Sequence, residues 1–240
     1  MANPPSADEL LTKIFDRQRH VLALRFAQWL ASSKRFRAFT ETYQTKIRAK
    51  VRNSQDQARL GDIAFELETA YWLLQEPRLT VAYEQPGGGS ARRPDFAVTF
   101  TTKFTFSVEV TRMRSTPSEE SERDSNKLHY VVANKLAQML PGMINLLVVG
   151  AADEFVCNIE IDTVMAQMKK RVEAKDAQLF SRGGFSDASE FFRHYHRLSG
   201  IWLCSTPAQA NTRQTRLWVN KEAKHPLLPP LPTILKTPNG

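Results

Sequence analysis

The segment 143–149 (MINLLVV), followed by Gly150, constrains the fold of this chain more than any other feature. Its apolar residues fall at both odd and even positions, so an extended strand there would present apolar side chains on both faces. Strands of this kind occur in sheets that helices cover on both sides, as in α/β proteins. The run therefore predicts a buried strand. The patterns around it predict an α/β fold with a mixed central sheet flanked by helices.

Composition excludes several classes of protein. Apolar residues make up 42% of the 240 residues and charged residues 24%, which is typical of a globular chain and not of a disordered one. No apolar run reaches the roughly 20 residues that span a bilayer, and the start MANPP lacks the pattern of a secretory signal. The two cysteines, Cys157 and Cys204, form no CxxC pair, so we expect a reducing cytoplasm and neither a disulfide scaffold nor a cysteine zinc site.

Positive charge is concentrated at the N-terminus. Residues 1–59 hold 12 Lys and Arg against 5 Asp and Glu, whereas the rest of the chain holds 21 against 20. Apolar stripes predict two helices here, Ser6–Trp29 and Ser33–Arg52, joined as a hairpin that packs on the main domain or on a second copy. Such a segment attracts a polyanion, most commonly nucleic acid, although basic helices are also simply well solvated.

The remaining patterns divide the chain into three parts. We expect the basic helical hairpin over 1–56, an α/β domain over 57–225 and an extended proline-rich tail over 226–240. The elements expected in the α/β domain are a helix over 60–75, strands over 79–84, 94–100 and 104–111, a mobile loop over 114–125, a helix over 127–140, a strand over 143–149, helices over 159–175 and 187–197, and strands over 201–205 and 216–220.

Two acidic residues meet on the hairpin predicted around the turn at Lys103. Strand periodicity puts Asp95 and Glu109 on the face opposite the hairpin's phenylalanines, and the turn pairs Asp95 with Glu109 or with Thr111. Cross-strand partners lie about 5–8 Å apart, so the two carboxylates would repel each other unless a cation lay between them. A hard divalent cation suits such oxygen ligands. The plain alternative is a pair of acids that face solvent.

The order helix–strand–strand–strand–helix–strand, with acids at these positions, resembles the PD-(D/E)xK, or restriction-endonuclease-like, nucleases. The motif stands as PD at 94–95, then thirteen residues, then EVT at 109–111. The preceding helix carries Glu66, which is similar to the glutamate often found in the family's first helix. The resemblance covers about residues 57–150 and implies an αβββαβ core preceded here by the N-terminal helical hairpin.

The resemblance also implies a chemistry. Asp95, Glu109 and Glu66 would be metal ligands and catalytic acids, with Mg²⁺ or Mn²⁺ binding the scissile phosphate and activating water to leave a 5′ phosphate and a 3′ hydroxyl. The sequence departs from the family at the last motif position, where Thr111 replaces the usual lysine. Threonine donates one hydrogen bond but supplies no positive charge.

Other basic residues could supply the missing charge or bind the nucleic acid. Lys127 or Lys135 on the following helix could reach the acids, as could Arg114 if its loop closes. We also expect Arg92 and Arg93, just before the motif, to contact phosphates together with Arg114 and Lys127.

Three functions fit these patterns. The first is a metal-dependent nuclease that acts on DNA more readily than on RNA. The second is a catalytically inactive protein of the same fold that binds nucleic acid. The third is an interaction module that forms a homodimer through its N-terminal helices.

Overall fold

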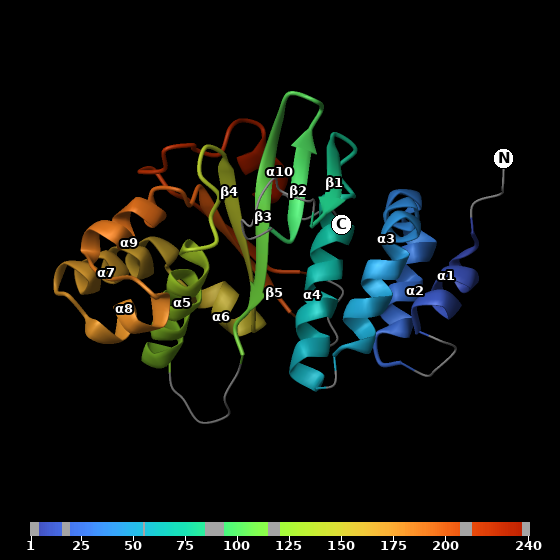
Figure 1. Ribbon diagram of the computed structural model, residues 1–240, viewed down its shortest axis with the longest axis horizontal. Helices are drawn as coiled ribbons and strands as arrows, with labels where there is room; N and C mark the ends of the chain where they lie inside the picture. The colour runs from blue at the N-terminus through green and yellow to red at the C-terminus, as the bar shows by residue number, and fades with distance from the viewer. Residues whose placement is uncertain are drawn as a thin grey trace.

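The computed structural model describes residues 5–15, 20–54, 56–84, 94–114, 121–206 and 213–236, and of residues 121–125 it describes the backbone alone. Their centre is one six-stranded mixed sheet with the order β1-β2-β3-β4-β5-β6 (Figure 1). The strands are β1 (Leu79–Tyr83), β2 (Phe96–Phe100), β3 (Phe104–Arg112), β4 (Ile144–Ala151), β5 (Gly200–Ser205) and β6 (Thr215–Val219). The first three strands form an antiparallel meander, β3, β4 and β5 are parallel, and β6 is antiparallel to β5. The predicted α/β class with a mixed sheet is confirmed.

Helices cover both faces of the sheet (Figure 1). The helices are α1 (Ala7–Phe15), α2 (Ala23–Ser32), α3 (Lys34–Arg52), α4 (Gln57–Leu73), α5 (Ser121–Leu136), α6 (Asp153–Asn158), α7 (Ile161–Glu173), α8 (Ala177–Gly183), α9 (Ala188–Tyr195) and α10 (Leu231–Lys236). One apolar core joins α1–α4 and α10 to one face, and a second joins α5–α9 to the other. Every residue of β4 is buried, as its apolar run predicted. Among the described helices, none is both long and apolar enough to cross a bilayer.

The hairpin register brings the motif residues together. Phe96 lies opposite Val108, so the next position toward the open end of the hairpin sets Asp95 against Glu109. Around Glu109 this face of β3 is covered, because Leu147, the neighbour of Glu109 on β4, belongs to the core under α5. The alternation of side chains along the strand therefore determines which face of the sheet Glu109 occupies. Its low exposure, 6%, results from the helices that pack on that face.

The single helix expected over Ser6–Trp29 is wrong. The chain forms α1 and α2 instead, and the Leu22 N–H donates to His20 Nδ1 at 3.2 Å just before α2 begins. The Phe15 ring stacks on the His20 ring at 4.8 Å and packs edge-on against Phe26 at 5.6 Å. Two short helices bury both apolar stripes in one core, which one straight helix of that length would not do.

Three further differences concern helices. The mobile loop expected over 114–125 is wrong in its last part, because α5 begins at Ser121. The extended tail is wrong over α10, where Leu231 and Leu235 are buried against the core. The short helices α6 and α8 were not predicted; each offers too few turns for a periodic signal.

The N-terminal helices are joined to the sheet by apolar and polar contacts. Phe36 of α3 is fully buried, and its ring lies 5.4–6.0 Å from the rings of Phe26, Trp29, Phe39 and Tyr71. Arg35 Nη1 donates to the carbonyl oxygens of Leu74 and Glu76, each at 2.6 Å. These carbonyls follow α4, whose last turn leaves such acceptors without helical partners.

This shared core predicts that the helices and the sheet unfold together. We expect Phe36→Ala to lower the free energy of unfolding by about 3–5 kcal/mol, because it leaves a cavity among the surrounding rings. Urea denaturation followed by circular dichroism measures the effect, with Leu24→Ala as the control since Leu24 is 75% exposed. Two separate transitions, or equal effects of the two substitutions, would contradict a shared core.

Candidate active site

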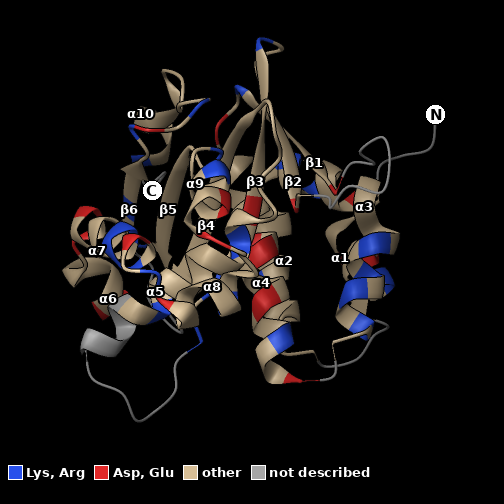
Figure 2. Ribbon diagram, turned by 60° about the vertical axis from the view of Figure 1, so that its left-hand side comes forward, with Lys and Arg blue, Asp and Glu red and all other residues tan. Residues whose placement is uncertain are grey.

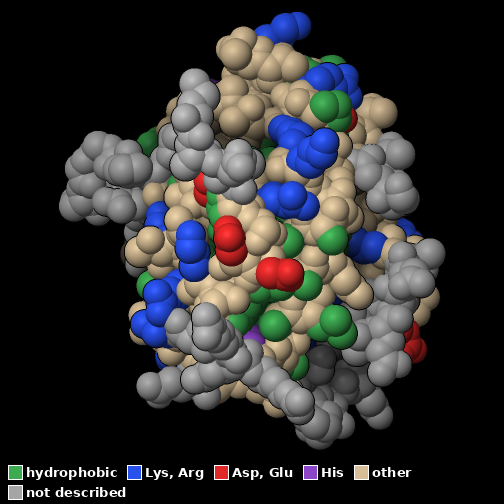
Figure 3. All heavy atoms as spheres, turned by 90° about the vertical axis from the view of Figure 1, so that its right-hand side faces the viewer, with side chains coloured by type: hydrophobic (Ala, Val, Ile, Leu, Met, Phe, Trp, Pro, Cys, Tyr) green, Lys and Arg blue, Asp and Glu red, His purple; other side chains and the backbone are tan. Residues whose placement is uncertain are grey.

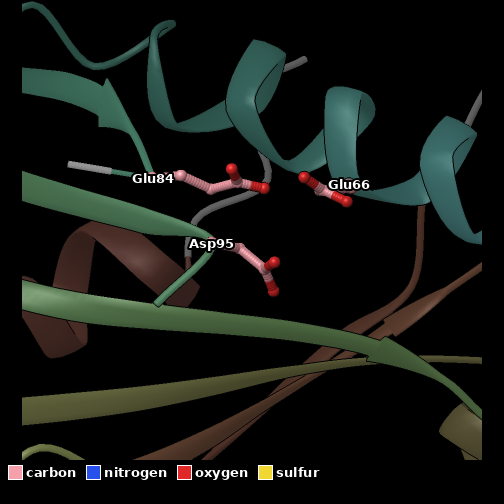
Figure 4. Close-up of side chains that lie close together, drawn as sticks. All are labelled: Glu66, Glu84 and Asp95. Atoms are coloured by element: carbon pink, nitrogen blue, oxygen red, sulfur yellow. The ribbon is translucent and has the colours of Figure 1, made fainter. Parts of the chain in front are cut away.

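Carboxylates from three segments converge beside the end of the β1–β2 pair at which the chain leaves β1 and enters β2 (Figure 4). Glu66 lies on α4, Glu84 directly follows β1, and Asp95 directly precedes β2. One oxygen from each of these carboxylates lies within 4.8 Å of the other two. The three residues are half-buried, so a small ion could be held at this point by oxygen ligands alone.

The backbone fixes Glu84 and Asp95 side by side. The Glu84 N–H donates to the Asp95 carbonyl oxygen at 2.9 Å, which extends the β1–β2 pairing by one position. Glu84 has φ +40°, a left-handed conformation that costs free energy for a residue with a side chain. Ion pairs with Lys46 and Lys50 hold the Glu84 side chain in place.

Glu109 completes the group from the next strand. It is only 6% exposed and takes the next paired position opposite Asp95, whose Oδ2 accepts from the Val110 N–H at 2.8 Å. Asp95 therefore lies between Glu66, on the face of the sheet that α4 covers, and Glu109, on the face that α5 covers.

Burial changes the charge of these acids. Burial, followed by the negative charge of Glu109 and the hydrogen bond to it, raises the pKa of Asp95 to about 7. Burial and the charge of Asp95 raise the pKa of Glu66 to about 7 as well, although Lys50 acts in the opposite direction. Burial also acts to raise the pKa of Glu84, but its contacts with Lys50 and Lys46 hold it below its usual value. Two of the acids thus carry a proton readily near neutral pH.

Three lysines lie around the carboxylates. Lys50 Nζ is 2.6 Å from Glu66 Oε1 and 2.5 Å from Glu84 Oε1, and Lys46 Nζ is 3.2 Å from Glu84 Oε2. On the other side, Lys135 Nζ of α5 is 3.8 Å from Glu109 Oε2. Lys135 was one of the residues expected to reach the acids, whereas the two α3 lysines were not.

The other residues expected at the site lie in different places. Thr111 is half-buried and shares the strand face of Glu109. Arg114 does not reach the acids; its Nη2 donates to Asp62 Oδ2 at 2.9 Å. Lys127 lies on α5, and Arg92 and Arg93 lie outside the described residues.

Much of the N-terminal positive charge is engaged inside the molecule. Arg25 pairs with buried Glu68, and Arg37 Nη2 donates to the Leu30 carbonyl oxygen at 3.0 Å. Lys and Arg follow α3, and Asp and Glu mark the neighbouring α4 (Figure 2). The face of the molecule that lies on the right in Figure 1 shows Lys and Arg in several separate groups rather than in one patch (Figure 3).

Sequence reasoning missed Glu84 and Lys50. Glu84 was taken as the end of a strand, although its position just before the loop leading to Asp95 was a signal that it could share that site. Lys46 and Lys50 are spaced i, i+4 and so lie on one side of their helix, but nothing in the sequence says which neighbour that side meets.

Comparisons with known proteins found no match: no protein-family model, no curated protein and no solved structure matches this chain.

The raised pKa of Asp95 predicts how stability depends on pH. A carboxyl group with a raised folded-state pKa favours folding below its unfolded pKa of 3.8, and that contribution is lost as the pH rises through about 7. We therefore expect the wild type to lose stability relative to Asp95→Asn as the pH rises from 5 to 8, by on the order of 1.4 kcal/mol per unit of pKa shift.

Urea unfolding in the presence of a chelator measures this difference. Glu154→Gln is the control, because Glu154 is exposed and should keep the wild-type pH profile. Equal pH profiles for wild type and Asp95→Asn would show that Asp95 does not titrate in this way.

Proposed function

We propose that the protein is a metal-dependent nuclease that hydrolyses phosphodiester bonds, with DNA as the favoured substrate. The observation that carries this proposal is the convergence of Glu66, Glu84, Asp95 and Glu109 in a partly buried site. The order α4-β1-β2-β3-α5-β4 agrees with the αβββαβ core of the restriction-endonuclease-like fold. That agreement supports the resemblance of the PD and EVT segments to the family motif.

The residues present fit a divalent cation. All of the ligand candidates are carboxylates, the hard oxygen donors that Mg²⁺ and Mn²⁺ prefer. Asp95 and Glu109 take the next paired position beyond Phe96 and Val108, and an ion bound between them would displace a proton held there. When bound, the ion would lower the pKa of water and neutralise charge on the phosphate.

The chain's own residues supply the remaining parts of the reaction. Lys135 brings a positive charge next to Glu109, as the motif lysine would have done from the position of Thr111. It can stabilise the negative charge that develops on the phosphate during attack by water. Thr111, on the same strand face, can donate one hydrogen bond to the water or to a phosphate oxygen.

The described surface also suggests where the nucleic acid lies. The side chains of Arg59 and Arg114 are 67% and 62% exposed and pair with Asp56 and Asp62 at the start of α4. Asp62 is one helical turn from Glu66, so both arginines lie on the approach to the acids. A phosphate can take over such exposed ion pairs, because they contribute little to stability. Arg114 is one of the residues expected from the sequence to contact phosphates, and Arg59 joins it in this proposal.

A nuclease assay tests the function. We expect the wild type to cleave double- or single-stranded DNA with Mn²⁺ or Mg²⁺ and not with a chelator. Asp95→Asn and Glu109→Gln should each lower the rate by at least about 100-fold, because each removes a proposed ligand. Glu154→Gln is the control of matched chemistry at an exposed position.

The same assay distinguishes the inactive alternative, which Thr111 in the lysine position favours. DNA binding that weakens with salt, without cleavage under any metal condition, would contradict the nuclease and support a binding protein. If the protein neither binds nor cleaves DNA, an interaction module is the remaining candidate function.

A second prediction concerns Lys135. We expect Lys135→Met to lower the cleavage rate by about 100- to 1,000-fold with little change in the affinity for Mn²⁺, because the lysine acts on the phosphate and not on the ion. Lys170→Met, at an exposed position on α7, is the control. Calorimetric Mn²⁺ titration alongside the rate measurement separates the two roles. A rate unchanged by Lys135→Met would exclude it as the substitute for the motif lysine.

A further inference from the structure

The acid cluster already contains a cation that belongs to the chain. Lys50 Nζ donates to Glu66 Oε1 at 2.6 Å and contacts Glu84 Oε1 at 2.5 Å. It therefore bridges two of the three carboxylates whose ligand atoms converge in Figure 4. The Lys50 side chain is 27% exposed and that of Glu66 12%, so this bridge lies inside the site and not on its rim.

Tyr83 holds the ammonium group of Lys50 from a further side. Lys50 Nζ lies 4.8 Å from the centre of the Tyr83 ring, and Lys46 Nζ lies 5.2 Å from it. Tyr83 is 1% exposed, and within the described part of the chain its hydroxyl makes no hydrogen bond of ordinary geometry. The ring attracts a cation through its π electrons. Glu66, Glu84 and Tyr83 thus form a binding position for one positive charge.

The opposite side of the cluster has no such cation. Asp95 makes no ion pair with another described residue, and its Oδ2 accepts from the Val110 N–H. The described lysine on this side, Lys135, stays 3.8 Å from Glu109 Oε2, which is longer than a charge-assisted hydrogen bond. The side of the cluster formed by Asp95 and Glu109 is therefore the side that is open to a metal ion.

We propose that Lys50 takes the place of a second divalent cation, so that the site binds one metal ion, on the side of Asp95 and Glu109. The inference rests on the metal-dependent function proposed above and specifies its stoichiometry. Lys50 is then a positioning residue: its ion pairs hold Glu66 and Glu84 in place without contacting the substrate.

Distance explains why the second ion is excluded. A divalent ion lies about 2 Å from a carboxylate oxygen, so an ion on Glu66 Oε1 or Glu84 Oε1 would be within about 5 Å of the Lys50 ammonium group. Like charges at that separation repel strongly in a partly buried site. A second ion would bind there only if the Lys50 ammonium group moved away from Glu66 and Glu84.

Counting bound Mn²⁺ on the full chain tests the proposal. We expect calorimetry and metal analysis to give one ion per wild-type chain and two per Lys50→Met chain. Lys50→Arg should remain at one, because it keeps the positive charge. Lys46→Met is the matched control from the same helix face, and it should also remain at one because Lys46 pairs with Glu84 and not with Glu66 among the described acids.

Glu84→Gln provides an independent measurement on a chain that keeps Lys50. In this variant the single ion should still bind, whereas Glu84→Gln added to Lys50→Met should remove the second ion. Loss of the ion from the single Glu84→Gln variant would overturn the proposal, as would one ion of unchanged affinity on Lys50→Met. A wild type that binds no ion would instead overturn the metal-dependent function itself.

Discussion

The burial of several carboxyl groups at one point is the constraint on which the rest of this structure depends. Glu66 lies on a helix, Glu109 on a strand, and Glu84 and Asp95 directly beside the ends of two strands; all four are buried or half-buried. Unpaired charges in such a place are costly, so each must be protonated, paired with a cation or bound to a metal. Lysine ammonium groups pair with the acids on one side of the group, and on the other side burial raises the pKa of Asp95 to about 7.

This arrangement gives the N-terminal helices a structural role. Their apolar stripe completes the core on one face of the sheet, and Arg35 hydrogen bonds with the chain between α4 and β1. Lys46 and Lys50 then bring positive charge to acids that α4 and β1 carry. A basic segment that resembled a free nucleic-acid arm therefore uses much of its charge within the molecule.

The local patterns of the sequence predicted most elements that lie around the site. Alternation identified the β2–β3 hairpin, and the run before Gly150 identified β4 as buried on both faces. These patterns succeed because the side chains of a strand alternate strictly between two faces, so the apolar residues of a buried face recur at a regular spacing in the sequence. The N-terminal helix was predicted too long, since helical periodicity continues across a chain reversal when both helices face one core. The short α6 and α8 left too little periodicity to detect.

The sequence by itself determined that Asp95 and Glu109 would meet, because hairpin register depends on neighbours in the chain and on the period of two. The resemblance to the nuclease family also singled out Glu66, which lies beside Asp95 and Glu84 in the structure. Only the tertiary structure decided that Lys50 would lie among these acids and Lys135 beside them. Their positions depend on how whole helices pack against the sheet, and helix packing is set by surfaces far apart in the sequence that no local pattern records.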